Sequence, residues 1–330
     1  ADGIQKVHTQ PTSRLGGVGI FMGLVMGTTY VWTLQTHGDG QVSVVLWLCL
    51  TALPVWLGGM AEDLTHKVGP SLRLLLAMVS AAWLFAAGGV GVHHTDVWPV
   101  DQLLRIPGAS LCVTLLVVAG FTHSVNITDG FHGLASGLCM VIFGALAAMA
   151  WSVGDTLVLQ LCLVGVAATA GFFVVNWPGG KIFLGDAGAY ILGFWVVETG
   201  LLLVMRNPGI SPMAPVVVGI VPLIETLFSM YRRRVVRKHP VNHPDALHLH
   251  TLVYRRVVRK NTPPGSKQGS ANARVAVYFW AAAALWAFGA WWLRDNTADL
   301  LSLMVMYLAA YIWCYRRLVH LHAPRTRLRG

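Results

Sequence analysis

Long runs of apolar residues, separated by short polar segments, follow one another along almost the whole chain. Most runs are close to the ~20 residues that an α-helix needs to cross the core of a bilayer. The pattern predicts ten membrane-spanning helices, at 17–35, 42–60, 71–92, 109–125, 134–152, 156–175, 188–205, 212–231, 275–293 and 301–315. We therefore expect an all-α integral membrane protein that forms one polytopic domain over residues 1–330. The connection 93–108 has room for a short interfacial helix.

The composition supports a membrane protein over a buried soluble fold. Of the 330 residues, 55% are hydrophobic and only 12% are charged, whereas a soluble domain has about 25% charged residues. The five cysteines all fall within apolar runs and show no CxxC spacing, so neither a disulfide framework nor a zinc site is expected.

Basic residues are divided unequally between the two sets of loops. When successive loops are assigned to alternate sides, one side holds 21 of the 24 Lys and Arg residues, and such a bias is typical of the cytoplasmic side. We expect both termini and the long loop 232–274 to be cytoplasmic. The net charge of +10 then reflects topology, and nucleic acid is not an expected partner.

Five polar segments on the predicted cytoplasmic side carry the candidate chemistry, at 6–17, 59–67, 126–133, 183–188 and 244–250. Each segment alone would be interpreted as helix capping, because Asp and Asn beside Gly are common at helix ends. Five on one face favour a divalent cation, and their carboxylate and amide oxygens suit Mg²⁺ or Mn²⁺. The i, i+2 spacing of His248 and His250 does not match a helical zinc site.

Cationic side chains close to these acids suggest phosphate binding. Lys67, Arg73 and Lys181 lie in or next to the polar segments. Phosphoryl transfer depends mainly on positioning and on neutralising charge, which this combination supplies. Glu225 falls inside an apolar run, where an ionisable group needs a partner, and we expect that partner to be Arg232 or Arg233.

The five polar segments, in their order along the chain, resemble the motifs of the polyprenyl-phosphate N-acetylhexosamine-1-phosphate transferase family. This family comprises the WecA-like and MraY-like enzymes of glycosyltransferase family 4. The resemblance runs from Lys6 to about Arg256. It implies transfer of a sugar-1-phosphate from a UDP-sugar to a membrane polyprenyl (undecaprenyl) phosphate, with release of UMP, at the cytoplasmic face of the bacterial inner membrane. It also implies one more helix before Lys6 in the natural protein.

The same resemblance implies roles for individual residues. Asp186 and Asn126 match metal-binding positions for Mg²⁺ or Mn²⁺. Glu62, Asp63 and Asp129 match acidic positions of the catalytic site. Substrate contacts are implied for Lys67, Arg73, Phe131, His132, Asp245, His248 and His250.

The loop around His248 favours one branch of this family. Its Pro-Asp-Ala-Leu-His-Leu-His sequence resembles the hexosamine-using enzymes, whereas the peptidoglycan enzymes have three adjacent histidines. We therefore expect a UDP-N-acetylhexosamine donor and a product used for O-antigen or a similar surface glycan. A phospho-MurNAc-pentapeptide transferase is the alternative, and an ion-coupled transporter is a weaker one, because most acids on the predicted inner side adjoin helix ends. A second copy of the chain, forming a homodimer, is a further partner that we consider.

Overall fold

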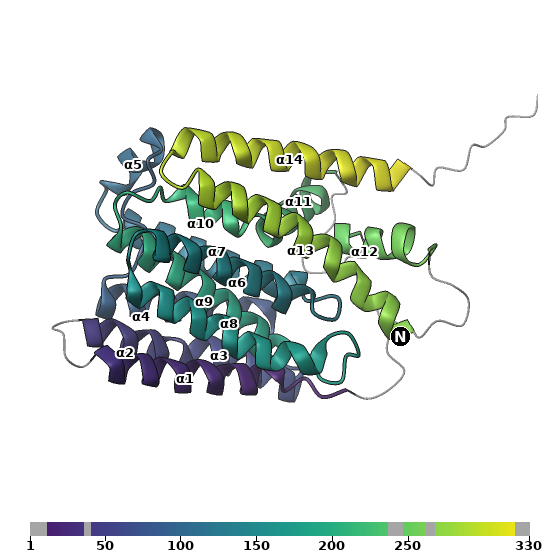
Figure 1. Cartoon of the computed structure of the whole chain (residues 1–330), viewed down its shortest axis with the longest axis horizontal. Coiled ribbons are helices and arrows are strands. Elements are labelled where there is room, and N and C mark those ends of the chain that lie inside the picture. The colour runs from purple at the N-terminus through teal and green to yellow at the C-terminus, as the bar shows by residue number, and fades with distance from the viewer. Residues whose placement is uncertain (1–11, 36–40, 237–246, 262–267, 321–330) are drawn as a thin grey trace, which may run out of the picture.

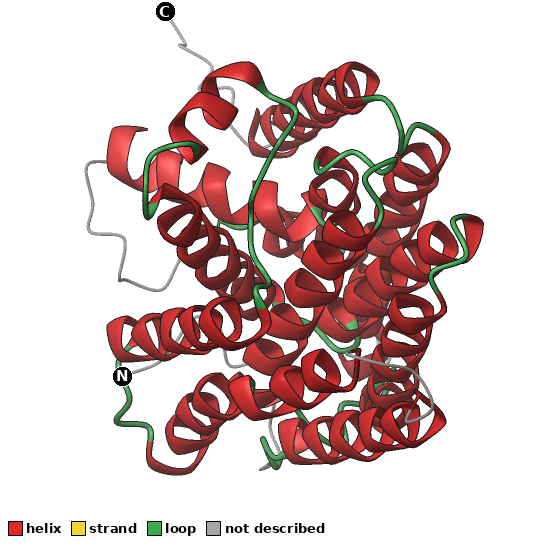
Figure 2. Cartoon of the chain, turned by 90° about the vertical axis from the view of Figure 1, so that its left-hand side faces the viewer, coloured by secondary structure: helices red, strands yellow, loops and turns green. Residues whose placement is uncertain are grey.

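The computed structural model describes residues 12–35, 41–236, 247–261 and 268–320. Its long helices lie side by side in a bundle (Figure 1), which Figure 2 views nearly end-on. They are α1 (Gly16–Gln35), α2 (Gln41–Thr51), α3 (Leu53–Thr65), α4 (Pro70–Gly88), α6 (Ala109–Thr128), α7 (Leu134–Ser152), α8 (Thr156–Asn176), α9 (Gly185–Arg206), α13 (Gln268–Trp292) and α14 (Thr297–His320). The prediction of an all-α membrane protein is confirmed.

Nine segments of the described chain are long and apolar enough to cross a membrane, with α2 and α3 combining into one of them, Val44–Thr65. The remaining predicted span, 212–231, is broken into α10 (Met213–Val218) and α11 (Ile220–Tyr231). Pro222 explains the break, because its nitrogen cannot donate to the carbonyl four residues earlier, at Val218. Gly219 fills the gap between the two helices.

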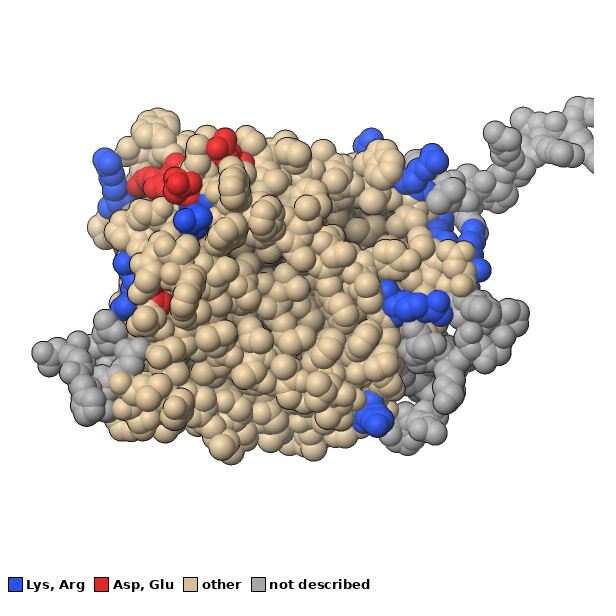
Figure 3. All heavy atoms as spheres, viewed as in Figure 1, with Lys and Arg blue, Asp and Glu red and all other residues tan. Residues whose placement is uncertain are grey.

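Short elements occupy the two ends of the bundle. The helix α5 (Trp98–Leu104) lies in the connection where an interfacial helix was expected. At the opposite end, η1 (Arg232–Val236) continues α11, and α12 (Leu249–Val253) leads into η2 (Tyr254–Val258). Figure 3 shows charged side chains at both ends of the molecule and an uncharged surface between them, as a membrane-spanning band requires.

The helix α3 is longer than its hydropathy predicts. The predicted span stops at residue 60, whereas the helix continues to Thr65 and places Glu62 and Asp63 in its last turns. His66 then ends it in the left-handed conformation, with its N–H bonded to the Glu62 carbonyl. The two acidic side chains therefore project from a rigid helix and not from a loop.

The helix α9 is central, because α1, α3, α6, α7 and α8 all pack against it. Glycine allows a close approach of α3 to α9: a Cβ on Gly59 of α3 would lie 2.6 Å from the Ala187 Cα in the first turn of α9. Small residues at helix contacts let backbones come together in this way inside membranes. The glycine thus brings the acidic end of α3 against the start of α9.

Candidate active site

Asp63 fixes the start of α9. Its Oδ1 accepts the N–H of Asp186 at 2.9 Å, and its Oδ2 accepts the N–H of Ala187 at 2.8 Å. The side chain is 9% exposed, so these two bonds satisfy a buried carboxylate at the positive end of a helix. Asp63, a predicted catalytic residue, therefore lies in the site and fixes the backbone of Asp186, a predicted metal ligand.

Asp186 lies where three helices meet. Its Oδ1 accepts a hydrogen bond of 3.0 Å from the side-chain amide of Asn126, at the end of α6. Its Oδ2 forms an ion pair with Nη1 of Arg73, from the first turn of α4. The structure thus brings together Asn126, Asp186 and Arg73, which lie far apart in the sequence.

The donor set around Asp186 fits a divalent cation of the magnesium type. Apart from the ion pair with Arg73, Oδ2 of Asp186 is buried and has no hydrogen-bond donor among the described residues. Asn126 uses its amide nitrogen for the bond to Asp186, so this bond leaves its amide oxygen free to act as a ligand. A carboxylate and an amide oxygen are hard ligands of the kind that Mg²⁺ and Mn²⁺ take.

Tyr190 completes this cluster, and the sequence reasoning missed it. The Arg73 guanidinium lies over the Tyr190 ring, 5.6 Å from its centre. The Tyr190 hydroxyl in turn bonds to Nε2 of His123 at 3.2 Å. The signal was available, since Tyr190 follows Asp186 by four residues and so occupies the same face of α9.

Asp129 ends α6 close to Asp63. Burial, and in second place the charge of Asp63, raise the pKa of Asp129 to about 7, while Arg14 opposes the shift. A carboxyl group with such a pKa exchanges its proton readily near neutral pH. The position of Asp129 and its raised pKa agree with a role at the reacting groups.

Glu62 and Lys67 lie at the edge of the site. Oε2 of Glu62 accepts the N–H of Val68 at 2.7 Å and so closes the connection between α3 and α4. Lys67, within that connection, is exposed to solvent and can reach an incoming anion. Lys181, in the segment before α9, is exposed as well.

His248 and His250 form a second cluster around Glu225 of α11. Oε1 of Glu225 lies 3.1 Å from Nδ1 of His248 and 3.7 Å from Nδ1 of His250. The two imidazole rings are parallel, with their centres 5.1 Å apart. The sequence reasoning did not expect these histidine contacts, and Arg232, one of the two predicted partners of Glu225, bonds to the Leu247 carbonyl and to the Tyr315 hydroxyl.

The turn after α6 connects the two clusters. A Cβ on Gly130 would lie 3.1 Å from Nε2 of His250, so a side chain at this position would force the imidazole to move by a few tenths of an ångström. Phe131 packs edge-on against the His250 ring, with 5.6 Å between ring centres. Asp129 precedes this turn and His250 packs against it, so the turn lies between the two clusters.

Phe131 and His132 are less accessible than the resemblance implies. Phe131 is 9% exposed and His132 is 4% exposed. Nδ1 of His132 lies 3.1 Å from the Pro178 carbonyl, and its ring fills the space beside Gly180. In this structure both side chains are buried and pack beneath the surface of the turn after α6. Asp245 lies outside the described residues.

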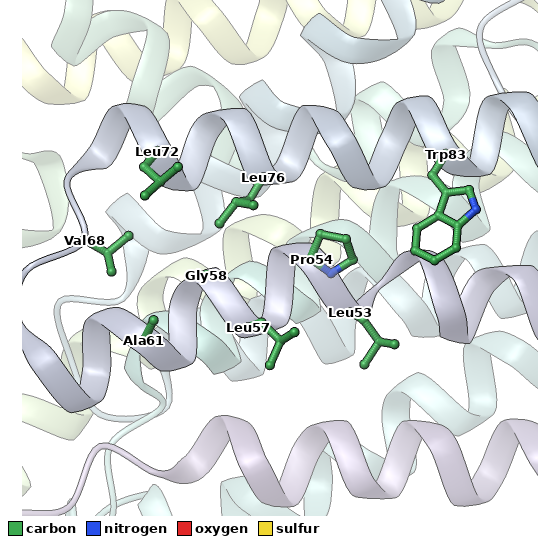
Figure 4. A pocket seen from close by; sticks show the side chains of 9 residues that line it. All are labelled: Leu53, Pro54, Leu57, Gly58, Ala61, Val68, Leu72, Leu76 and Trp83. Carbon is green, nitrogen blue, oxygen red and sulfur yellow. The ribbon is translucent and has the colours of Figure 1, made fainter.

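An apolar groove of about 470 Å³ runs along α3 and α4 toward the site. Leu57, Leu72, Leu76 and Trp83 are among the side chains that line it (Figure 4). At one end it reaches Val68, whose N–H is held by Glu62, next to Asp63. An apolar chain bound along the groove would therefore end beside Glu62.

His250 provides a test of this geometry through pH. Burial lowers its pKa from 6.5 to about 4, while Glu225 opposes the shift. Between these two values the unfolded chain binds more protons than the folded one, so folding stability falls as pH decreases from 6.5 to 4. Asp129, whose pKa is raised, has the opposite dependence, so the contribution of His250 is measured as the difference between the wild type and His250→Gln. Between pH 7 and pH 5 we expect the unfolding temperature of the detergent-solubilised wild type to fall relative to that of His250→Gln, and an equal pH dependence in both proteins would contradict the burial of His250.

Comparison with known proteins places this site in a family. A family model described as glycosyl transferase family 4 matches residues 44–204. A Bacillus subtilis protein named as a probable undecaprenyl-phosphate N-acetylglucosaminyl 1-phosphate transferase is 28% identical over 247 residues, covering 74% of this chain and 66% of its own length. The phospho-N-acetylmuramoyl-pentapeptide-transferase of the same organism is 30% identical over 306 residues, covering 86% of this chain and 83% of its own.

A third relative extends the pattern. The phospho-N-acetylmuramoyl-pentapeptide-transferase of Geobacillus thermodenitrificans is 32% identical over 259 residues, covering 72% of this chain and 76% of its own. The matched segment 44–204 includes Asp63, Arg73, Asn126 and Asp186, the residues that meet at the start of α9. The resemblance suggested by the polar segments is thus confirmed, and the chain belongs to glycosyl transferase family 4.

Proposed function

We propose that the protein transfers an N-acetylhexosamine-1-phosphate from a UDP-sugar to a membrane polyprenyl phosphate, releasing UMP. The observation that carries the proposal is the meeting of Asp186, Asn126 and Arg73 at one end of a membrane-spanning bundle in a member of this family. The printed names of the relatives refer to undecaprenyl phosphate in one case and to a phospho-sugar peptide in the others. Both names describe the transfer of a phosphorylated amino sugar.

Asp186 and Asn126 would hold the divalent cation, which supplies charge neutralisation to the diphosphate when it is bound. Asp63 keeps Asp186 in place through the first turn of α9. Arg73 now balances the Asp186 charge, and it is placed to take a phosphate oxygen once that charge is otherwise matched. Lys67 adds a second cation at the rim.

The reaction needs little further proton chemistry. The phosphate of the acceptor lipid attacks the sugar-bearing phosphorus of the donor, and UMP leaves with the bonding electrons. Asp129, with a pKa of about 7, can accept a proton from an acceptor phosphate that still carries one. The apolar groove beside Val68 supports a lipid acceptor, since an apolar chain can lie there with its phosphate at the site.

We assign the site to the cytoplasmic face of the bacterial inner membrane, because the loops at this end carry most of the basic residues. The donor is a simple UDP-N-acetylhexosamine, and the product primes O-antigen or another surface glycan. The two-histidine loop motif supports this choice. The muramyl-pentapeptide relatives make that donor the second candidate.

An ion-coupled transporter has less support. Such a protein places ionisable groups near the middle of the membrane. Among the described residues Glu198, in the middle of α9, is a buried acid of this kind. Asp63, Asp129 and Asp186 lie at helix ends, where a phosphorylated substrate can reach them.

The decisive test is an assay of UMP release by the purified protein. Undecaprenyl phosphate, Mg²⁺ and a panel of UDP-linked donors, including UDP-MurNAc-pentapeptide, would be supplied in turn. We expect turnover with a UDP-N-acetylhexosamine, complete loss with EDTA, and recovery with Mg²⁺ or Mn²⁺. Turnover that persists after chelation would remove the cation from the proposal, and faster use of the muramyl donor would move the protein to the other branch.

A further inference from the structure

The last helix of the chain reaches the histidine pair through a single carboxylate. Oε2 of Glu225 accepts a hydrogen bond of 3.0 Å from the Tyr311 hydroxyl of α14. Oε1 of the same carboxylate accepts the N–H of Leu249 at 2.8 Å and faces His248 and His250. Glu225 is 2% exposed and Tyr311 is 4% exposed, so these bonds are shielded from water.

We propose that Tyr311 is a positioning residue for the histidine pair and acts on it through Glu225. This inference rests on the proposed function in one respect, because it assumes that the histidines contact the UDP-sugar. A carboxylate that receives a hydroxyl on one oxygen loses its freedom to rotate, so the edge presented to the histidines is fixed. None of these residues lies within the matched segment 44–204.

A second connection between α14 and the loop supports this arrangement. Nη1 of Arg232 donates to the Leu247 carbonyl and to the Tyr315 hydroxyl, each at 2.5 Å. Arg256, after the histidines, donates to the carbonyls of Leu318 and Val319 near the end of α14. The helix therefore holds the loop on both sides of His248 and His250.

A metal ion on Glu225, His248 and His250 is the competing interpretation, since their ligand atoms lie within 4.8 Å of one another. The hydrogen bonds argue against it. Oε1 of Glu225 already accepts from Leu249 N and from His248, and Oε2 accepts from Tyr311. A carboxylate oxygen has two lone pairs, so a metal on Oε1, the oxygen that faces both histidines, would have to displace one of its two donors.

The consequence for the site follows from the turn after α6. His250 lies against Gly130, next to Asp129, so the orientation of the histidine pair determines the shape of the surface between the two clusters. Loss of the Tyr311 hydroxyl leaves the carboxylate with one fixed oxygen. The histidines should then hold a UDP-sugar less firmly, while the acceptor groove beside Val68 is unchanged.

The test compares Tyr311→Phe with Tyr307→Phe in the full-length protein. Tyr307 lies one turn earlier on α14, is 8% exposed and packs its ring on Trp286, so it matches Tyr311 in burial and chemistry. In Tyr311→Phe we expect the KM for the UDP-sugar to rise about tenfold, as for a lost hydrogen bond to a charged group. The KM for the lipid acceptor should stay unchanged, and Tyr307→Phe should change both values by less than about twofold.

A second measurement does not depend on turnover. Amide hydrogen exchange of the segment from Leu247 to Tyr254 should be faster in Tyr311→Phe than in Tyr307→Phe, because the Leu249 N–H is bonded to Glu225. Glu225→Gln should retain slow exchange, since its amide oxygen still accepts this bond, and Glu225→Ala should lose it.

The outcomes separate this inference from the proposed function. Faster exchange in Tyr311→Phe, in a protein that uses no UDP-sugar, would support the connection and overturn the proposed function alone. Equal exchange in the two tyrosine variants, or a transition metal that co-purifies in one equivalent and is lost in Glu225→Ala, would overturn the positioning role.

Discussion

Asp186→Ala should reduce the rate of sugar-phosphate transfer by at least about 10³-fold, because loss of a metal-holding carboxylate removes several kcal/mol of charge stabilisation. The substitution also leaves the half-buried Arg73 guanidinium without its acidic partner. Asp186→Asn is the companion variant: its side-chain oxygen can still accept from Asn126, but its charge is gone. We expect the two variants to lose activity to a similar degree.

The control is Asp299→Ala, since Asp299 is an exposed acid in the first turn of α14 at the opposite end of the bundle. It should keep nearly full activity. Thermal unfolding of all three variants separates inactivity from misfolding. Near-native turnover in a folded Asp186→Asn would show that the charge of this residue is not needed, and the proposed metal site would then be wrong. We expect Asp129→Ala to be inactive in the same assay.

Gly59→Ala should have the second largest effect, through packing and not through chemistry. The added Cβ would lie 2.6 Å from the Cα and N of Ala187, and backbone atoms cannot move aside as a flexible side chain can. Overpacking of this kind costs about 1–3 kcal/mol. The end of α3 must shift, and Asp63 shifts with it, so we expect about 10²-fold lower activity from misplaced groups.

Gly120→Ala is the matched control for this variant. Gly120 lies in the spanning helix α6, and a Cβ there meets no atom within 4 Å among the described residues. Replacing glycine by alanine in a helix is otherwise favourable, so Gly120→Ala should be at least as stable as the wild type. Equal thermal stability and activity of the two alanine variants would show that α3 and α9 are not held by this contact.

The membrane fold could be predicted because hydrophobic length alone defines a spanning helix. Two details could not be read from hydropathy. Glu62 and Asp63 look like loop residues by polarity, yet they extend α3 because their carboxylates bond to backbone N–H groups of Val68 and of the first turn of α9. The break before Pro222 had a visible signal in the proline, but the apolar composition of residues 212–231 outweighed it.

The sequence indicated several residues that the structure brings together, but it did not indicate most of the contacts between them. Asp186 and Asn126 were paired through family resemblance, and the structure places them 3.0 Å apart. The partner of Glu225 was missed because arginines follow it closely in sequence, whereas His248 lies 23 residues away. Tyr311 is 86 residues from Glu225. A pattern along one chain does not reveal which distant side chain meets a buried carboxylate, since packing of separate helices decides it.

The capped start of α9 has a consequence for small molecules designed to bind this protein. Asp63 already accepts the N–H groups of Asp186 and Ala187, so the start of the helix does not offer them to an anionic inhibitor. An ammonium group, in contrast, can compete with Arg73 for the Asp186 carboxylate and requires no divalent cation to do so. Inhibitor screening is therefore best begun with cationic head groups on apolar tails, which the groove along α3 and α4 can accommodate.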